Sequence, residues 1–105
     1  MAFNQVESAG VRPAAAANST LYTSTGTASV LVTATNGTTS LRDVRIAHRR
    51  GGAALDNTMY KLYDFELLGN DFITVGPLFL ASGGKIDVRT DSTGVTFTME
   101  GLSTG

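Results

Sequence analysis

Cysteine and tryptophan are absent from this 105-residue chain, and histidine occurs once. Without cysteine there is no disulfide framework, no thiolate nucleophile and no thiolate metal site, and the redox compartment stays open. Charged residues make up 16% of the chain and the net charge is -1. Nucleic acids and anionic membranes are bound by strongly basic surfaces, which this balance does not supply. We therefore expect neither of them as a partner.

Long apolar runs are also missing. The first eight residues lack a basic leader followed by a continuous apolar stretch, so we expect no secretory signal and no membrane span, and a chain that is made and kept soluble. A length of 105 residues with 42% hydrophobic content fits one compact domain.

Apolar and polar side chains alternate through most of the sequence, which is typical of half-buried strands. The clearest case is residues 85–100, in which Ile86 and Val88 precede a polar turn at residues 91–94, and Val95, Phe97 and Met99 follow it. We predict that residues 85–89 and 95–100 form an antiparallel hairpin. A second turn is predicted at residues 83–84, after a short strand at residues 78–80.

Further strands are predicted from the same alternation at residues 20–23, 28–35, 41–48, 60–68 and 72–75. The turn signal at residues 36–37 makes the first part a meander, and residues 49–57 are predicted to join two sheets. A short helical turn near residues 55–60 is the main alternative. Proline at position 77 is expected to end its strand, because it cannot donate to a ladder. The fold predicted is all-β: an antiparallel β-sandwich or jelly-roll-like barrel of about seven to eight short strands.

Residues 1–18 show no useful periodicity, and Pro13 blocks a helix continuing from upstream. We predict an extended or flexible N-terminal arm over residues 1–18 and a single β-sandwich domain over residues 19–105. The arm is either a flexible tail or a segment that orders on a neighbouring subunit.

Catalytic patterns are not found. A lone His48 makes neither a metal site nor a triad, and the carboxylates at 64 and 66 or at 87 and 91 are explained by turns more simply than by catalysis. The glycines fit no phosphate-binding fingerprint. We expect no enzyme, no cofactor and no metal.

Partner binding is the remaining class of function. The candidates are apolar and basic residues of the arm and a basic group around residue 48, for which a solvated loop is the alternative. They are Phe3, Val6, Val11, Arg12, Arg42, Arg45, His48, Arg49 and Arg50. Tyr60 and Tyr63 could stack on sugar rings as in a glycan-binding module, although strand aromatics of a small sandwich usually fill its core or an interface.

Several segments follow one another in a recognisable order between about residues 20 and 102. They are Leu21-Tyr22-Thr23, the strand at 30–36, Val44-Arg45-Ile46, and the C-terminal segments 76–90 and 95–102. This order of segments resembles small structural proteins of tailed bacteriophages. In many of those proteins a strand, a short turn and a strand ending in glycine and an apolar residue close a β-sandwich.

The resemblance implies a virion component, with a capsid decoration or cement protein as the leading hypothesis. Such a protein is made in the host cytoplasm, binds the major capsid protein on the outer surface of a phage head and stabilises contacts between capsid subunits. A homo-oligomer is expected, with a trimer favoured. The alternatives are a tail, neck or fibre-associated phage protein, and a glycan- or protein-recognition module.

Overall fold

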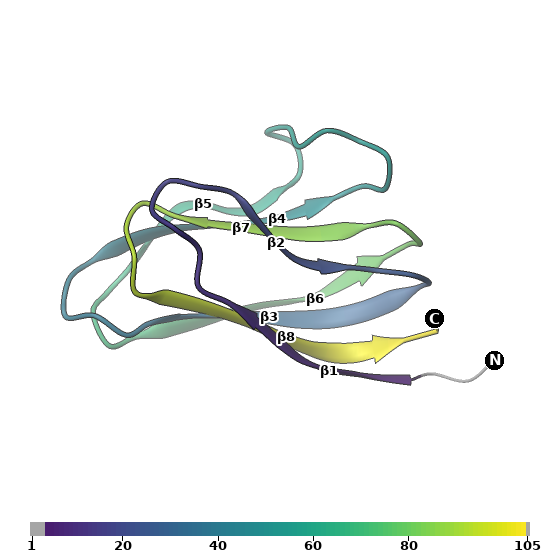
Figure 1. The fold of residues 1–105 in the computed structure, drawn as a ribbon, viewed down its shortest axis with the longest axis horizontal. Helices are drawn as coiled ribbons and strands as arrows, with labels where there is room; N and C mark the ends of the chain where they lie inside the picture. Colours follow the sequence, from purple (N-terminus) through teal and green to yellow (C-terminus); the bar gives the residue numbers. More distant parts are fainter. Residues whose placement is uncertain (1–3, 105) are drawn as a thin grey trace.

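Eight β-strands in two four-stranded antiparallel sheets make up the computed structural model (Figure 1), which describes residues 4–104 and their side chains from residue 10 onward. The all-β fold predicted from the sequence is confirmed. The strands are β1 (Asn4–Val11), β2 (Ser19–Thr23), β3 (Ala28–Asn36), β4 (Arg42–Arg49), β5 (Tyr60–Leu67), β6 (Phe72–Leu80), β7 (Lys85–Thr90) and β8 (Val95–Ser103). The described residues include no helix that could cross a membrane.

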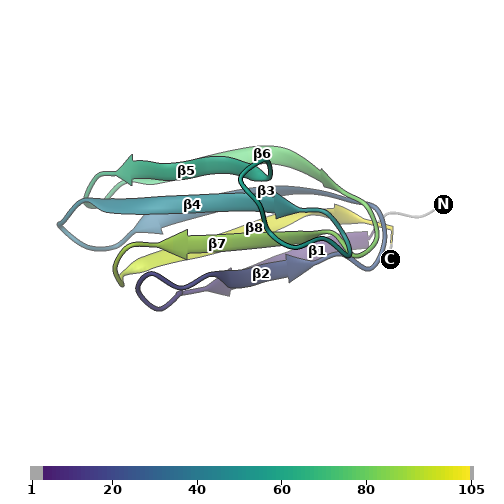
Figure 2. The same cartoon turned by 90° about the horizontal axis from the view of Figure 1, so that it is seen from above.

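The strand pairing follows one simple rule. The first strand pairs with the last, the second with the second to last, and so on toward the middle of the chain: β1 pairs with β8, β2 with β7, β3 with β6 and β4 with β5. The sheet orders are β1-β8-β3-β6 and β2-β7-β4-β5, and the two sheets lie face to face (Figure 2). This eight-stranded double sheet is the jelly-roll arrangement.

Most loops of the chain connect one sheet to the other, which differs from the predicted hairpins and meander. β7 and β8 lie in different sheets, so residues 91–94 cross the sandwich and do not close a hairpin. The turn at residues 83–84 crosses as well, and β2, β3 and β4 alternate between sheets, so the predicted meander is wrong. The loop after Arg49 was expected to join two sheets, but it connects β4 to its neighbour β5 in one sheet. Alternation shows which side chains face inward, but not which strand lies alongside.

The core lies between the two sheets, and the inward positions predicted from alternation are buried. Phe97 is its largest fully buried side chain. The other buried members come from seven strands: Leu21, Ala28, Val30, Val32, Ala34, Val44, Ile46, Leu67, Leu78, Leu80, Ile86, Val88, Val95 and Met99. At about 25 cal/mol for each Å² of apolar surface removed from water, this layer is the main stabilising term of the fold.

Strand β6 continues through the proline that was expected to end it. Val30 pairs with Leu78 and Val32 with Val75, so Gly76 and Pro77 form a bulge opposite a single residue of β3. Gly76 has a φ of 138°, a backbone conformation that glycine adopts without strain. β6 is an edge strand, where a missing amide donor can be tolerated.

The N-terminal segment also differs from the predicted arm. Residues 4–11 form β1, an edge strand whose partners run from Ser103 back to Phe97 on β8. The β-sandwich therefore begins before residue 19. Short strands without clear alternation carry little periodic signal, and here backbone pairing with β8 decides the structure.

Candidate interaction surfaces

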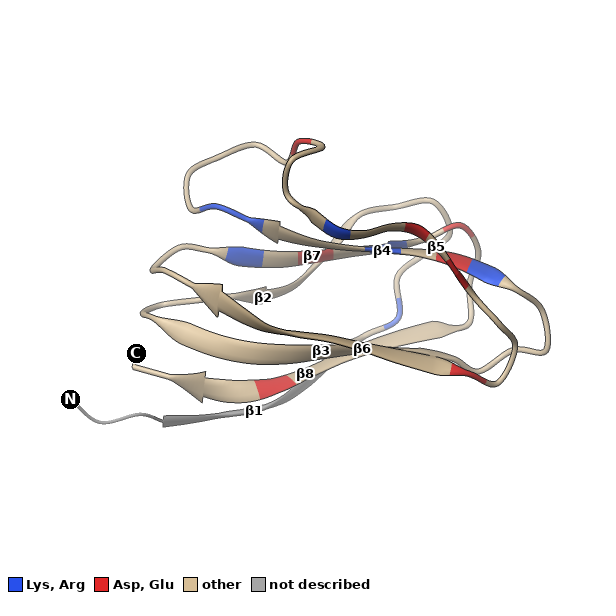
Figure 3. Cartoon of the chain, turned by 180° about the vertical axis from the view of Figure 1, so that it is seen from behind, with Lys and Arg blue, Asp and Glu red and all other residues tan. Residues whose placement is uncertain are grey.

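The outer faces of the two sheets differ in charge. β3 and β6 contain no charged residue, and Glu100 is the one charged residue of β8. Lysine, arginine and the acidic residues gather instead on β4, β5 and β7 (Figure 3). We call the outer face of β8, β3 and β6 the uncharged face, and the outer face of β7, β4 and β5 the charged face.

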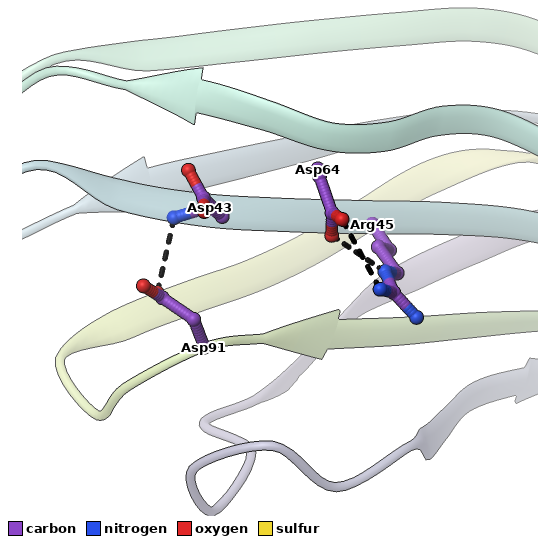
Figure 4. Close-up of polar contacts among 4 residues, drawn as sticks. All are labelled: Asp43, Arg45, Asp64 and Asp91. Carbon is purple, nitrogen blue, oxygen red and sulfur yellow. Dashed lines mark hydrogen bonds and ion pairs between the residues drawn. The ribbon is translucent and has the colours of Figure 1, made fainter.

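An ion pair lies at the centre of the charged face. Arg45 Nε donates to Asp64 Oδ1 at 2.7 Å and the Arg45 terminal nitrogen to Asp64 Oδ2 at 3.2 Å (Figure 4). Asp64 has a φ of 50° and sits in a bulge of β5 between the pairs Val44–Phe65 and Ile46–Leu62. The hydrogen bond from Arg45 lowers the pKa of Asp64, and the same bond raises the pKa of Arg45.

Tyrosine rings flank this ion pair. The Arg45 guanidinium carbon lies 4.1 Å from the centroid of the Tyr63 ring, and the Tyr60 ring meets Tyr63 edge-on with centroids 4.9 Å apart. A cation over an aromatic face is a favourable electrostatic contact. One face of Tyr63 is thus already covered, which reduces its value as a platform for a sugar.

A small polar hollow adjoins the pair. Asp91 Oδ1 accepts a hydrogen bond from the Asp43 amide nitrogen at 3.0 Å (Figure 4). The hollow measures about 210 Å³ and is lined by Ala16, Asp43, Arg45, Asp64, Arg89 and Asp91. Among the side chains of residues 10–104, no group of three or more histidine or acidic residues is arranged to hold a metal ion.

A second, more buried ion pair lies nearer the termini. Arg49 Nε lies 2.8 Å from Asp87 Oδ2, and Thr20 Oγ1 donates to Asp87 Oδ1 at 2.8 Å. The Asp87 side chain is 6% exposed. Arg50 makes only a long contact to Asp56, 3.7 Å between two exposed side chains.

The arginines proposed as partner-binding residues each have their own partner within the chain. Arg12 donates to Thr96, Arg42 to the Thr93 carbonyl, and Arg45 and Arg49 bind separate aspartates. His48 is partly buried in β4, and burial, followed by the nearby positive charges of Lys61 and Arg50, lowers its pKa below 6.5.

The predicted arm residues are divided as well. Val11 packs against the core from the end of β1. Val6 pairs with Gly101 on β8, and its side chain lies outside the described part. Phe3 lies outside the described residues altogether.

The uncharged face carries exposed apolar side chains that sequence reasoning did not single out. Phe72 and Phe79 are 64% and 68% exposed, and Leu31 and Leu102 are also exposed. A shallow hollow of about 610 Å³ lies among Ser29, Val30, Leu31, Pro77, Glu100, Gly101 and Leu102. Contiguous exposed apolar surface marks interaction sites. The available signal was the composition of β3 and β6, whose outward positions hold phenylalanine, leucine, serine and threonine but no charge.

A second apolar surface lies at the end of the sandwich opposite the termini. Leu41 and Leu68 are exposed on two adjoining turns, and we call them the apolar tip. The turns are joined by the Asn70 amide, which donates to the Thr38 carbonyl, and by the Asn36 side chain, which donates to the carbonyls of Ser40 and Leu68. These bonds hold both leucines on a fixed backbone.

Comparison with known proteins adds no relative: no protein-family model, curated protein or solved structure matches the chain.

Proposed function

We propose that this chain is a non-enzymatic virion structural protein of the capsid decoration or cement type, which binds the outside of a phage head and stabilises contacts between capsid subunits. The observation that carries the proposal is a compact sandwich with two separate exposed apolar surfaces, the uncharged face and the apolar tip. A protein that clamps neighbouring subunits needs at least two surfaces, because one surface can bind only one neighbour at a time.

The remaining features fit a building block. Jelly-roll sheets occur in viral capsid proteins as well as in lectins, so the fold alone does not choose between the phage hypothesis and a recognition module. The covered ring of Tyr63 disfavours glycan stacking at the one tyrosine pair considered for it. The resemblance to phage structural proteins then favours the virion.

The apolar tip is our candidate for the capsid contact. Leu41 and Leu68 project from hydrogen-bonded turns, so binding would bury them at little cost in backbone entropy. Additive burial at many copies would raise the heat resistance of the particle, because a ligand that binds only the intact shell stabilises it.

Co-sedimentation with particles tests the proposal. Purified protein is mixed with heads and, separately, with tails of the phage that carries the gene, both stripped of this protein. We expect saturable binding to heads and a higher temperature of head disruption. The double change Leu41→Ser and Leu68→Ser should abolish both effects, whereas Lys61→Glu on the charged face should leave them intact. Binding to tails alone would support the tail, neck or fibre alternative, and binding to neither would overturn the virion assignment.

A further inference from the structure

The uncharged face is built of regular rows that cross β6, β3 and β8. Ser29 pairs with Phe79 and Leu102, Thr33 with Thr74 and Thr98, and Thr35 with Phe72 and Thr96. Between the first two rows, Leu31 lies beside Pro77 and Glu100. The Thr33 and Thr74 hydroxyls lie 2.9 Å apart, which places both side chains on the same face. The row of three threonines lies between one row with a negative charge and another with a positive charge.

The negative charge is that of Glu100 and the positive charge is that of Arg12, and both lie at about the same distance from the row of three threonines. Glu100 is two residues from Thr98 along β8 in one direction, and Thr96 is two residues away in the other. Arg12 Nε donates to Thr96 Oγ1 at 2.9 Å, so its guanidinium lies at the Thr96 row. Each charge is therefore about 7 Å from the centre line, at about 3.3 Å per residue.

We propose that the uncharged face packs against the same face of a second copy about a two-fold axis at the threonine row. The two copies of β8 then run antiparallel, and the Glu100 row of each copy lies opposite the Thr96 row of the other. Glu100 thus meets the second copy's Arg12, and the contact occurs twice. A two-fold interface requires this kind of self-complementary surface.

The apolar side chains match under the same operation. The row that holds Phe72 faces the row that holds Pro77 and Leu31, so the exposed Phe72 ring enters the shallow hollow of the second copy. Sheets pack face to face about 10 Å apart, which leaves room for one layer of interdigitated side chains. The contact between Glu100 and Arg12 and the fit of Phe72 into the hollow both identify a second copy of the chain as the partner that covers the uncharged face.

The expected dimer is reversible. The overlapping part of the three-stranded uncharged face corresponds to roughly 1,000 Å² of buried surface in total, below the ~1,600 Å² of a standard interface. This self-association does not depend on capsid binding, and it gives a dimer where the sequence analysis favoured a trimer.

Native mass measured by sedimentation equilibrium over a range of concentrations tests the dimer. We expect the full chain to approach twice its 11.0 kDa mass as concentration rises. Glu100→Arg or Arg12→Glu alone sets like charges against each other at two places and should raise the dissociation constant about tenfold. The double variant restores both pairs with exchanged signs and should return to within about threefold of the original value.

Controls lie on the charged face. Lys61→Glu changes the net charge as much as Arg12→Glu does, and Tyr63→Ser removes an exposed ring as Phe72→Ser does. Phe72→Ser should weaken the dimer and Tyr63→Ser should not. Thermal unfolding of each variant shows whether it is folded, and every altered side chain named here is at least partly exposed.

Three results would overturn the proposal. They are a single-copy mass up to millimolar concentration, a trimer at any concentration, and a double charge variant that is as weak as the single ones. A protein that does not form this dimer but still binds phage heads would leave the proposed function intact. The dimer and the capsid binding are therefore tested independently.

Discussion

Asn36 is 1% exposed, and its side chain is fully engaged with the backbone of neighbouring turns. Its amide nitrogen lies 2.7 Å from the Ser40 carbonyl, 3.0 Å from that of Leu67 and 3.2 Å from that of Leu68, and Oδ1 accepts from the Thr38 amide. A buried polar group is costly only when its partners are removed. Asn36 therefore holds together the turns that carry the apolar tip.

Replacing Asn36 by aspartate should destabilise the protein by about 2–4 kcal/mol at neutral pH, because a carboxylate would face three carbonyl oxygens. Urea unfolding measures the change. Asn57→Asp makes the same chemical replacement at an exposed turn position and should change the free energy of unfolding by less than about 0.5 kcal/mol. Equal effects at the two sites would show that the buried amide bonds contribute little.

The two arginines at the end of β4 should differ in the same kind of measurement. Arg49→Met leaves the Asp87 carboxylate buried with only the Thr20 hydroxyl as a partner, and we expect a loss of about 2–3 kcal/mol. Arg50→Met removes a 3.7 Å contact between side chains that are 63% and 52% exposed, and should cost less than about 0.5 kcal/mol. A larger effect at Arg50 would contradict the difference in burial.

His48 should make stability depend on pH near neutrality. Its folded pKa is lowered below 6.5, so between the folded and unfolded pKa values the unfolded chain binds more protons. The free energy of unfolding should therefore be highest above about pH 7.5 and fall as the pH drops through 6.5. His48→Gln should remove this dependence of stability on pH, because the chain has no other histidine. If the dependence persisted in this variant, it would come from a group other than His48. The lowered pKa values of Asp56 and Asp64 act only in a more acidic range.

At the scale of the elements, β8 has no room for a side chain at position 101, where it pairs with β3. A Cβ atom on Gly101 would lie 2.0 Å from the Ser29 carbonyl oxygen, and that oxygen belongs to the backbone of β3. At Gly10 on β1, the nearest atom would be 3.6 Å from a new Cβ, which is ordinary contact. Position 101, which lines the hollow of the uncharged face, therefore accepts glycine without a clash against the β3 backbone, and a larger residue would collide with it.

Gly101→Ala should destabilise the fold by at least about 2 kcal/mol, since two paired backbones would have to separate. Gly10→Ala adds the same methyl group to the same sheet and should stay within about 0.5 kcal/mol of the original. Thermal or denaturant unfolding of the pair gives the comparison. A Gly101→Ala protein of unchanged stability would mean that the strands can move apart freely.

Strand positions and the inward faces of β3, β4, β7 and β8 could be predicted from the sequence, because period-two alternation depends on local chain geometry. The bulges at Gly76 and Asp64 could not, since each is defined by a residue on the neighbouring strand. The candidate surface was missed for a related reason. Strand aromatics in general were expected to fill a core or an interface, and only the register with β3 and the exposure of the rings show that Phe72 and Phe79 face outward.

For the whole molecule, the pairing rule makes most contacts long-range in sequence. Asn4 pairs with Ser103, and β2 with β7 across most of the chain. Closing such loops costs entropy before any contact repays it. The sequence could not reveal this pairing, because each strand alone would accept several neighbours.

Folding should accordingly be slow for a domain of this size, with refolding times of milliseconds to seconds. Stopped-flow dilution from urea measures the rate. Refolding within microseconds would contradict this expectation, because it would require a folding nucleus built from local contacts. Among the eight strands described, β4 and β5 are the one pair of consecutive strands that lie side by side in a sheet.

The antiparallel pairing of β1 with β8 has a practical consequence for engineering. Both ends of the chain leave the sandwich at the same place, one strand apart (Figure 1). A short peptide could join them into a circle, and new ends could be opened in the exposed loop after Arg50 without breaking a strand. A fusion partner attached at either end of this chain would emerge from the same part of the surface, at the far end of the sandwich from Leu41 and Leu68.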